Sequence, residues 1–202
     1  MTAVPPPPLN LAALLKGTRL AGPGLRDAVW VQGCGIGCPG CANQAYLAHA
    51  PRRWMPVERL LAHFAARRGR IDGASVSGGE PSEQAEPVAA LLRGVQALGM
   101  STVVYSGRTY ESLRRDPACA ELLAHTDLLI DGPFLLAQRD LALAWRGSRN
   151  QRLLRLTGRF SAADLAPPEV SGEIVISGRS VLLNGIGTQG MIAAETPWTG
   201  QG

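Results

Sequence analysis

The sequence predicts an α/β fold with a parallel sheet, followed by a C-terminal β-hairpin. Between residues 27 and 130, short apolar runs alternate with amphipathic helical patterns, as in parallel α/β sheets. After residue 145 this alternation stops, and two strand-like runs flank a turn, as in a hairpin. Polar or glycine-rich segments directly follow the predicted parallel strands, at the sheet edge where such folds bind ligands. We therefore expect one site built from several strand ends.

The first two strands and the first helix are predicted from short sequence patterns. Asp27–Gln32 is an apolar run that ends at a cysteine-rich loop. A helix is predicted from Pro56, because proline suits the first helical turn, with one apolar face formed by Val57, Leu60, Leu61 and Phe64. The second strand, Gly73–Ser77, leads into Gly78-Gly79-Glu80-Pro81.

The second helix and the next two strands continue the alternation of helices and strands. The helix has an apolar stripe and is expected to end at Gly99; the stripe consists of Val88, Leu91, Leu92, Val95 and Leu98. Thr102–Tyr105 is the third strand and precedes Ser106-Gly107-Arg108. A helix with Leu122 and Leu123 comes before the fourth strand, Leu128–Ile130, which ends at Asp131-Gly132-Pro133.

The C-terminal part is predicted to be mainly extended. Gln151–Leu156 is a possible fifth strand, and Glu173–Ile176 with Val181–Leu183 forms the hairpin. The length of 202 residues suits one compact core with terminal extensions. We expect a flexible proline-rich segment over residues 1–18, a core over residues 19–157, and an extension with the hairpin over residues 158–202.

Composition narrows the class of protein. Hydrophobic residues make up 46% of the chain and charged residues 18%, which is typical of a soluble globular protein. No apolar run reaches the roughly 18 residues that a membrane helix needs, so a cytoplasmic protein is expected. The net charge of +4 comes from nineteen scattered arginines and Lys16. Only 5% of residues are aromatic, so stacking platforms for bases are scarce and nucleic acid is not an expected partner.

The strongest chemical signal is a C-x3-C-x2-C loop formed by Cys34, Cys38 and Cys41. Cysteines clustered in one loop of a cytoplasmic protein indicate metal or redox chemistry rather than a disulfide framework. Three thiolates among glycines can hold one [4Fe–4S] cluster and leave one iron open for another ligand. The alternative is a structural zinc site, with Cys119 or His49 as the fourth ligand.

With its neighbouring motifs, this loop resembles the radical S-adenosylmethionine enzymes. Among them it is most similar to the small activases of glycyl radical enzymes, which include the activating enzymes of anaerobic ribonucleotide reductases. The resemblance spans about residues 20–155 and rests on Gly22–Arg26, Val31–Asn43, Ser77–Pro81, Asp131–Phe134 and Trp145–Arg152. It implies a partial parallel (β/α) barrel of radical S-adenosylmethionine type. It also implies one [4Fe–4S] cluster on the three cysteines, and S-adenosyl-L-methionine as the cofactor that is cleaved to a 5′-deoxyadenosyl radical.

The resemblance also implies how the strand ends contact S-adenosylmethionine. The segment Gly78, Gly79, Glu80 and Pro81 would line its amino group, with Glu80 as the hydrogen-bond acceptor. Gly40 stands where many radical enzymes have an aromatic residue, so the backbone would contact the adenine there. Ser106 would meet the ribose or the carboxylate, and Asp131 would face the site. An ordinary turn residue remains the alternative for both.

The segment after residue 145 is the expected contact with the substrate. By resemblance it lies near the site and would contact a peptide backbone or an anionic group through Arg146, Ser148, Asn150, Gln151 and Arg152. The alternative is a solvated charged loop. The implied partners are flavodoxin or ferredoxin as electron donor and a glycyl radical enzyme that offers a glycine.

Two other functions remain open from the residues. One is a stand-alone radical enzyme that modifies a peptide or a small metabolite. The other is a non-catalytic iron–sulfur electron carrier or sensor, which would not need Gly78–Pro81. The chain also continues about fifty residues past the resemblance, and no role is predicted for that extension.

Overall fold

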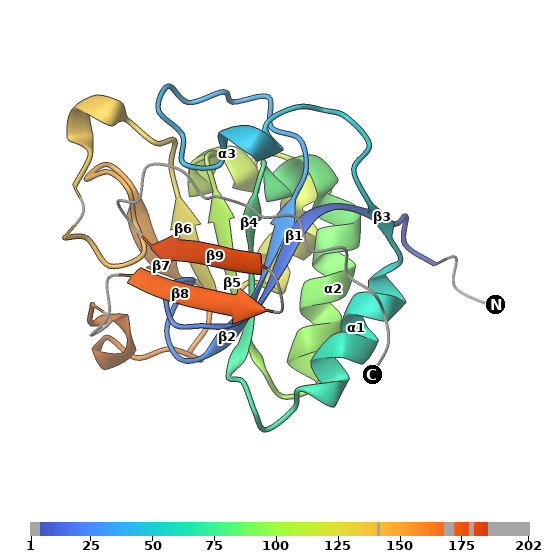
Figure 1. Cartoon of the computed structure of the whole chain (residues 1–202). Coiled ribbons are helices and arrows are strands. Elements are labelled where there is room, and N and C mark those ends of the chain that lie inside the picture. Colours follow the sequence, from blue (N-terminus) through green and yellow to red (C-terminus); the bar gives the residue numbers. More distant parts are fainter. Residues whose placement is uncertain (1–4, 141, 168–171, 178–179, 186–202) are drawn as a thin grey trace.

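The computed structural model describes residues 5–140, 142–167, 172–177 and 180–185. Their core is a seven-stranded sheet in the order β3-β1-β2-β4-β5-β6-β7 (Figure 1). Its strands are β1 Leu9–Thr18, β2 Arg26–Val31, β3 Trp54–Met55, β4 Gly73–Gly78, β5 Ser101–Ser106, β6 Leu128–Asp131 and β7 Arg152–Arg155. The α-helices are α1 Val57–Ala66, α2 Ala85–Ala97, α3 Tyr110–Arg114 and α4 Ala120–Ala124. Short 3-10 turns are η1 Gln44–Tyr46, η2 Pro81–Gln84, η3 Pro117–Cys119, η4 Leu136–Gln138 and η5 Ala163–Leu165.

The centre of the sheet is parallel, as the alternating pattern predicts. β2, β4, β5 and β6 pair in parallel, whereas β1, β3 and β7 join antiparallel at the two sides. The register sets Val31 opposite Gly78 and Ser106 opposite Asp131. The expected convergence of four strand ends at one edge of the sheet is therefore confirmed.

Alternate residues of these strands face opposite sides of the sheet, with one large core on one side and two smaller clusters on the other. Val29, Val76, Val104 and Leu129 pack in the large core with the apolar faces of α1, α2 and α4. Residues of the opposite parity contact two smaller clusters, one with Tyr46 and one with Trp145 and Phe160; these residues are Ala28, Trp30, Val103, Leu128 and Ile130. Period-two burial on both faces explains why these strands read as continuous apolar runs.

Strand β1 lies where the proline-rich N-terminus predicts a flexible segment. Leu9 and Leu11 are fully buried, and the strand pairs with both β2 and β3. Its register with β2 shifts between Leu11 and Ala13 and again between Leu15 and Thr18. Such irregularities break the alternation of buried and exposed residues by which a strand is found in a sequence. The folded region therefore begins well before residue 19.

The predicted C-terminal hairpin is present as β8 (Gly172–Ser177) and β9 (Ser180–Gly185), which pair antiparallel. It crosses in front of the sheet in the view of Figure 1. The Glu173 carboxylate accepts hydrogen bonds from the Thr18 hydroxyl and from the Arg19 N–H, the latter at 2.8 Å. The hairpin is thus joined to the end of β1. The glycine-rich segment beyond Gly185 lies outside the described residues.

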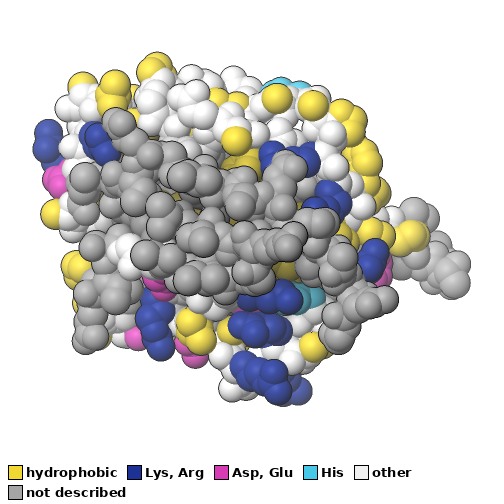
Figure 2. All heavy atoms as spheres, viewed as in Figure 1, with side chains coloured by type: hydrophobic (Ala, Val, Ile, Leu, Met, Phe, Trp, Pro, Cys, Tyr) yellow, Lys and Arg dark blue, Asp and Glu magenta, His cyan; other side chains and the backbone are white. Residues whose placement is uncertain are grey.

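The surface and the helices add two observations. On the described part of the face in Figure 2, lysine and arginine side chains (dark blue) stand in separate groups rather than in one stripe. In the part of the chain that the structure describes, no helix is long and apolar enough to cross a membrane.

Candidate iron–sulfur and S-adenosylmethionine site

The cysteine loop connects the end of β2 to η1 at the edge where the strand ends meet. Cys34, Cys38 and Cys41 are all free thiols and partly exposed. The N–H groups of Gly33 and Cys34 donate to the Tyr46 and Leu47 carbonyls at 2.8 and 2.9 Å. The loop is therefore folded back on its own C-terminal end, and the Cys38 and Cys34 thiols lie near enough to Cys41 to affect its pKa.

The donor set suits an iron–sulfur cluster. Burial raises the pKa of the Cys41 thiol, and the nearby Cys38 and Cys34 thiols raise it further, against the opposing Asn43 N–H. Within the described residues, no three His, Cys, Asp or Glu side chains gather around a single-ion site. Thiolates of closely spaced cysteines are the ligands by which proteins hold iron–sulfur clusters.

Both candidates for a fourth zinc ligand have other partners. Cys119 is fully buried in the large core, with its sulfur 3.6 Å from an Arg108 nitrogen. The His49 ring lies 2.6 Å from the Glu83 carboxylate. Ligation of the cluster by Cys34, Cys38 and Cys41 alone stays a prediction.

Gly78 and Gly79 let the end of β4 pack directly on the cysteine loop. A Cβ on Gly79 would stand 2.0 Å from the Gly33 carbonyl oxygen, and one on Gly78 would stand 2.4 Å from the Val31 nitrogen. Glu80 N–H donates to the Gly33 carbonyl at 2.8 Å, and the Asn43 side-chain amide donates to the Gly78 carbonyl at 3.2 Å. The cysteine loop and the Gly78–Pro81 segment thus form one unit, in which Asn43 makes a contact that the sequence did not predict.

Glu80 is buried and fully engaged with protein groups. It is 1% exposed, and its carboxylate accepts from Ser82 N–H at 2.9 Å, the Ser106 hydroxyl at 2.8 Å and Gly107 N–H at 2.8 Å. Burial raises the pKa of Glu80, although these hydrogen bonds lower it in part. The carboxylate joins the ends of β4 and β5. Its contact with the amino group of S-adenosylmethionine stays a prediction, as do the ligand contacts of Gly78, Gly79 and Pro81.

Ser106 and Asp131 also turn toward protein rather than toward open space. The Ser106 hydroxyl, besides donating to Glu80, accepts from Arg108 N–H at 3.0 Å. The Asp131 side chain is fully buried, accepts from Tyr110 N–H at 2.6 Å and forms an ion pair with Arg152. For both residues the geometry favours the alternative of a structural turn residue over a ligand contact.

Comparison with known proteins identifies the family. The family described as a 4Fe-4S single cluster domain matches residues 20–154, which include the cysteine loop, β4 to β6 and most of β7. The chain belongs to this 4Fe-4S family.

Several relatives that share one name align with this chain over nearly their whole length. The anaerobic ribonucleoside-triphosphate reductase-activating protein of Vibrio cholerae is 35% identical over 67% of this chain and 91% of its own. The proteins of that name from Escherichia coli K12 and phage T4 are 30% and 29% identical, over 64% and 65% of this chain and 88% and 85% of their own. Among solved structures, QueE from Escherichia coli matches with a TM-score of 0.39 and 17% identity, over 52% of this chain and 54% of its own.

The loop after residue 145 has internal hydrogen bonds, and other hydrogen bonds join it to the segment after β6. Ser148 is fully buried and donates to the Asn150 side-chain oxygen at 2.7 Å. The Asn150 amide donates to the Pro133 carbonyl at 2.7 Å, and the Gln151 amide donates to the Gly132 carbonyl at 3.1 Å. Ser148, Asn150 and Gln151 act here as internal braces, and their contact with a partner stays a prediction.

Arg146 and Arg152, which are also predicted to contact the partner, bind other groups of the protein. Arg146 donates to the Gln151 carbonyl at 3.2 Å. Arg152 pairs with buried Asp131 and, at 2.8 Å, with exposed Glu111. Partner contact by these arginines stays a prediction. Arg149, which the sequence reasoning did not select, has the more open side chain, at 63% exposed.

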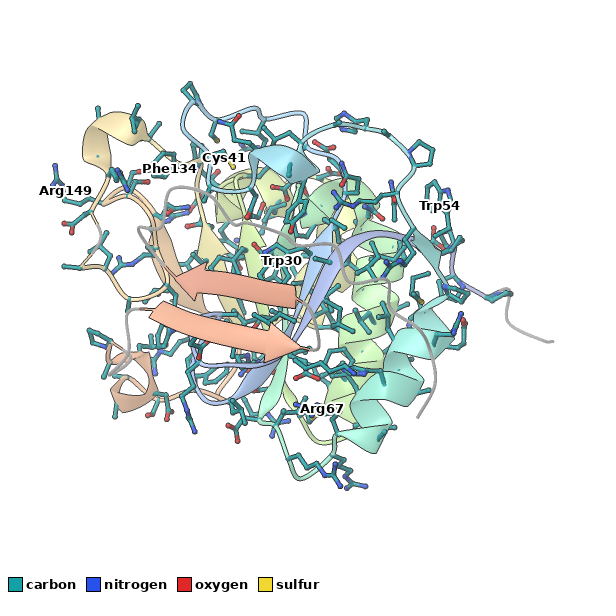
Figure 3. The ribbon with its side chains drawn as sticks, viewed as in Figure 1. Trp30, Cys41, Trp54, Arg67, Phe134 and Arg149 are labelled. Carbon is teal, nitrogen blue, oxygen red and sulfur yellow. The ribbon has the colours of Figure 1, made fainter. Side chains whose placement is uncertain are left out.

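Phe134 fills the space between the family's cysteine loop and the loop after residue 145. A Cβ on Gly40 would stand 3.4 Å from one ring carbon of Phe134, and one on Gly147 would stand 3.1 Å from another. Gly40 also has a φ of +75°, which favours glycine. Figure 3 shows Phe134 beside Cys41. Packing thus explains the glycine at position 40, and its backbone contact with adenine stays a prediction. The apolar run after Asp131 was the available signal for Phe134.

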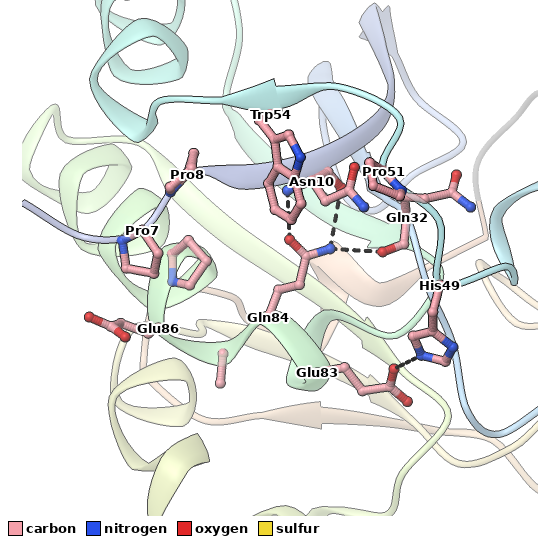
Figure 4. Close-up of a pocket in the computed structure, with 12 residues that line it drawn as sticks. Pro7, Pro8, Asn10, Gln32, His49, Pro51, Trp54, Glu83, Gln84 and Glu86 are labelled. Atoms are coloured by element: carbon pink, nitrogen blue, oxygen red, sulfur yellow. Dashed lines mark hydrogen bonds and ion pairs between the residues drawn. The ribbon is translucent and has the colours of Figure 1, made fainter.

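A surface cavity of about 490 Å³ lies beside β1 and the start of α2 (Figure 4). Its lining includes Pro8, Trp54, His49 and Glu83. The Glu83 carboxylate connects it to the cysteine loop, because its second oxygen accepts from Gly35 N–H at 2.7 Å. None of the three cysteines lines this cavity, so it is separate from the thiol surface.

Proposed function

We propose that this chain activates an anaerobic ribonucleoside-triphosphate reductase by generating a glycyl radical on it. The observation that carries the proposal is the cysteine loop packed on the Gly78–Pro81 segment, in a chain whose relatives are named as activating proteins of that reductase. An electron carrier would need the thiols alone. Packing of a second motif on the loop supports a site that binds a further ligand beside the cluster.

In the proposed reaction, the chain's residues bind and position. Cys34, Cys38 and Cys41 would hold one [4Fe–4S] cluster, and the backbone of residues 78–80 would receive the methionyl end of S-adenosylmethionine. Once reduced by an external donor, the bound cluster would supply the one electron that cleaves S-adenosylmethionine to methionine and a 5′-deoxyadenosyl radical, and this radical would take a hydrogen atom from the target glycine. Glu80 fixes the receiving backbone, and Phe134 closes the gap beside Gly40 against water.

The electron donor and the larger architecture belong to the same proposal. The partly exposed thiols support direct reduction by flavodoxin or ferredoxin. We propose that the four parallel strands with helices on one face form the partial (β/α) barrel of radical S-adenosylmethionine enzymes. This core would comprise residues 19–157 together with β1, and residues 158–202 would be an extension. Location in the cytoplasm stays a prediction.

The test combines reconstituted chain, the anaerobic reductase of the same organism, S-adenosylmethionine and dithionite under anaerobic conditions. We expect a carbon-centred glycyl radical in the electron-spin-resonance spectrum of the reductase, with 5′-deoxyadenosine formed in step. A stand-alone radical enzyme would instead turn over a free peptide or metabolite without the reductase. That result, with no radical on the reductase, would refute the proposal.

A further inference from the structure

Two large apolar side chains stand exposed beside the cysteine loop. Leu135 is 40% and Leu136 56% exposed, and among the described residues only Trp54 joins them as an exposed large hydrophobic side chain. A methyl group at Gly40, next to Cys41, would lie 3.2 Å from Leu136 Cδ1. We call Phe134, Leu135 and Leu136 the apolar lip. Trp54 lies on the other side of the molecule in Figure 3.

Hydrogen bonds from the following loop hold the apolar lip in one shape. Leu135 N–H donates to the buried Ser148 hydroxyl at 3.2 Å, and Arg149 N–H donates to the Gln138 carbonyl at 2.9 Å. The Phe134 ring is fixed between Gly40 and Gly147. Exposed leucines on a braced backbone lose little conformational freedom when they bind, which favours a docking contact.

Arginines border the apolar lip. Arg139 follows the η4 turn and is exposed, and no side-chain partner is found for it within the described residues. Arg149 is 63% exposed and lies 4.0 Å from the Asp140 carboxylate, a long and weak pair. Apolar contact area bordered by cations is complementary to a surface that presents apolar side chains next to a carboxylate.

We propose that the apolar lip docks the segment of the reductase that carries its target glycine. Apolar side chains of that segment would cover Leu135 and Leu136, and a carboxylate beside them would meet Arg139 or Arg149. This inference rests on the proposed function, in which the target glycine must come close to the cluster held by Cys34, Cys38 and Cys41 to lose its hydrogen atom. A segment bound on the apolar lip would lie beside Gly40 and Cys41, so a glycine within it would be close to the cluster.

The test measures binding of the chain to the purified anaerobic reductase of the same organism by biolayer interferometry. Cluster-loaded Leu135→Ser/Leu136→Ser chain should bind about tenfold more weakly or worse, as for central interface side chains. Trp54→Ser is the matched control, since it removes an equally exposed apolar side chain elsewhere, and it should bind like the unsubstituted chain. Arg139→Glu/Arg149→Glu should slow association, and the effect should shrink as salt is added.

The outcomes separate this proposal from the proposed function. If the double serine variant keeps its cluster and binds the reductase unchanged, the docking proposal fails while the function stands. If the unsubstituted chain neither binds the reductase nor forms a glycyl radical on it, both fail. Leu135→Ser alone, which leaves the Gly40 contact in place, should weaken binding in the same direction. A selective effect on reduction by flavodoxin, or a change from dimer to monomer in the variant, would assign the lip to another occupant and overturn the proposal.

Discussion

Glu80 joins two strand ends through one buried carboxylate, and this contact predicts how its loss should act. Glu80→Ala should weaken S-adenosylmethionine binding by about 1.5–3 kcal/mol, the range for hydrogen bonds to charged groups. The reason is that residues 78–80 lose their connection to Ser106 and Gly107. Isothermal titration of the cluster-loaded chain with S-adenosylmethionine provides the measurement.

A double-mutant cycle distinguishes positioning from direct contact. If Glu80 acts through Ser106, the effects of Glu80→Ala and Ser106→Ala should be strongly non-additive. Additive effects, with Ser106→Ala nearly neutral, would indicate that Glu80 contacts the ligand itself, as the resemblance implies.

The cysteines give the most direct prediction at this scale. Cys34→Ala, Cys38→Ala and Cys41→Ala should each abolish a content of about four irons and four sulfides per chain. Cys119→Ala should retain them, because Cys119 lies in the large core. Iron and sulfide analysis after anaerobic reconstitution is the measurement, and stoichiometric zinc without iron would contradict the assignment.

The sequence identified the site's segments better than the roles of their side chains. Spacing alone located the thiols, because close cysteines in a glycine-rich loop have few other uses. Whether Ser106, Asp131 or Ser148 faces a ligand or the protein depends on the groups that tertiary structure brings near, such as Arg152 beside Asp131. Nothing in the linear order of residues shows those neighbours.

At the scale of elements, the segment after β6 and the loop after residue 145 act as a pair. Asn150→Ala removes the bond to the Pro133 carbonyl and a partner of the Ser148 hydroxyl. We expect faster hydrogen exchange across residues 133–140 and a lower yield of glycyl radical per S-adenosylmethionine cleaved. Arg149→Ala is the exchange control, because its side chain only forms the long pair with Asp140. Equal exchange in both variants would show that Asn150 does not brace the segment.

Elements with a regular pattern were predicted closely, whereas the irregular strand β1 and the short elements β3 and α3 were missed. The helical stripe from Val88 to Leu98 corresponds to α2, with Gly99 at a φ of +83° just beyond it. Strand β1 escaped prediction because its two register shifts disturb the period of two, and because its alanines and leucines favour a helix. Long-range pairing overrides this local preference.

At the scale of the whole molecule, Asp27 connects three elements at the end of the sheet opposite the cysteines. Its buried carboxylate accepts from the Gly17 N–H at 2.7 Å and lies 2.7 Å from His63 and 2.8 Å from Arg67. Burial alone would raise the pKa of Asp27, but the hydrogen bonds from His63, Arg67 and Gly17 outweigh it and hold the pKa below its ordinary value. One charge thus ties β2 to β1 and α1.

Asp27→Asn should therefore lower the free energy of unfolding at neutral pH by about 3–5 kcal/mol, as when a buried pair loses one partner. Since the folded-state pKa lies below the unfolded value of about 3.9, the contribution is complete above that pH. This part of the contribution is lost as the pH falls through the folded-state pKa, so the difference between the two chains should narrow in acid. Denaturant unfolding as a function of pH measures the difference, and a gap that does not change with pH would contradict this origin.

The contact between Glu173 and the end of β1 has a consequence for the order of folding. Thr18 and Glu173 are 155 residues apart in the chain, so every residue up to Glu173 must leave the ribosome before they can meet. Strands β1 and β2, in contrast, are neighbours in sequence and can pair early. Closing so long a loop costs only slightly more entropy than closing one of half its length. The contact between Thr18 and Glu173 nevertheless forms after β1 and β2 have paired. During synthesis, the nascent protein would thus pass through a stage in which the seven-stranded sheet is assembled and the β8–β9 hairpin is not yet joined to it.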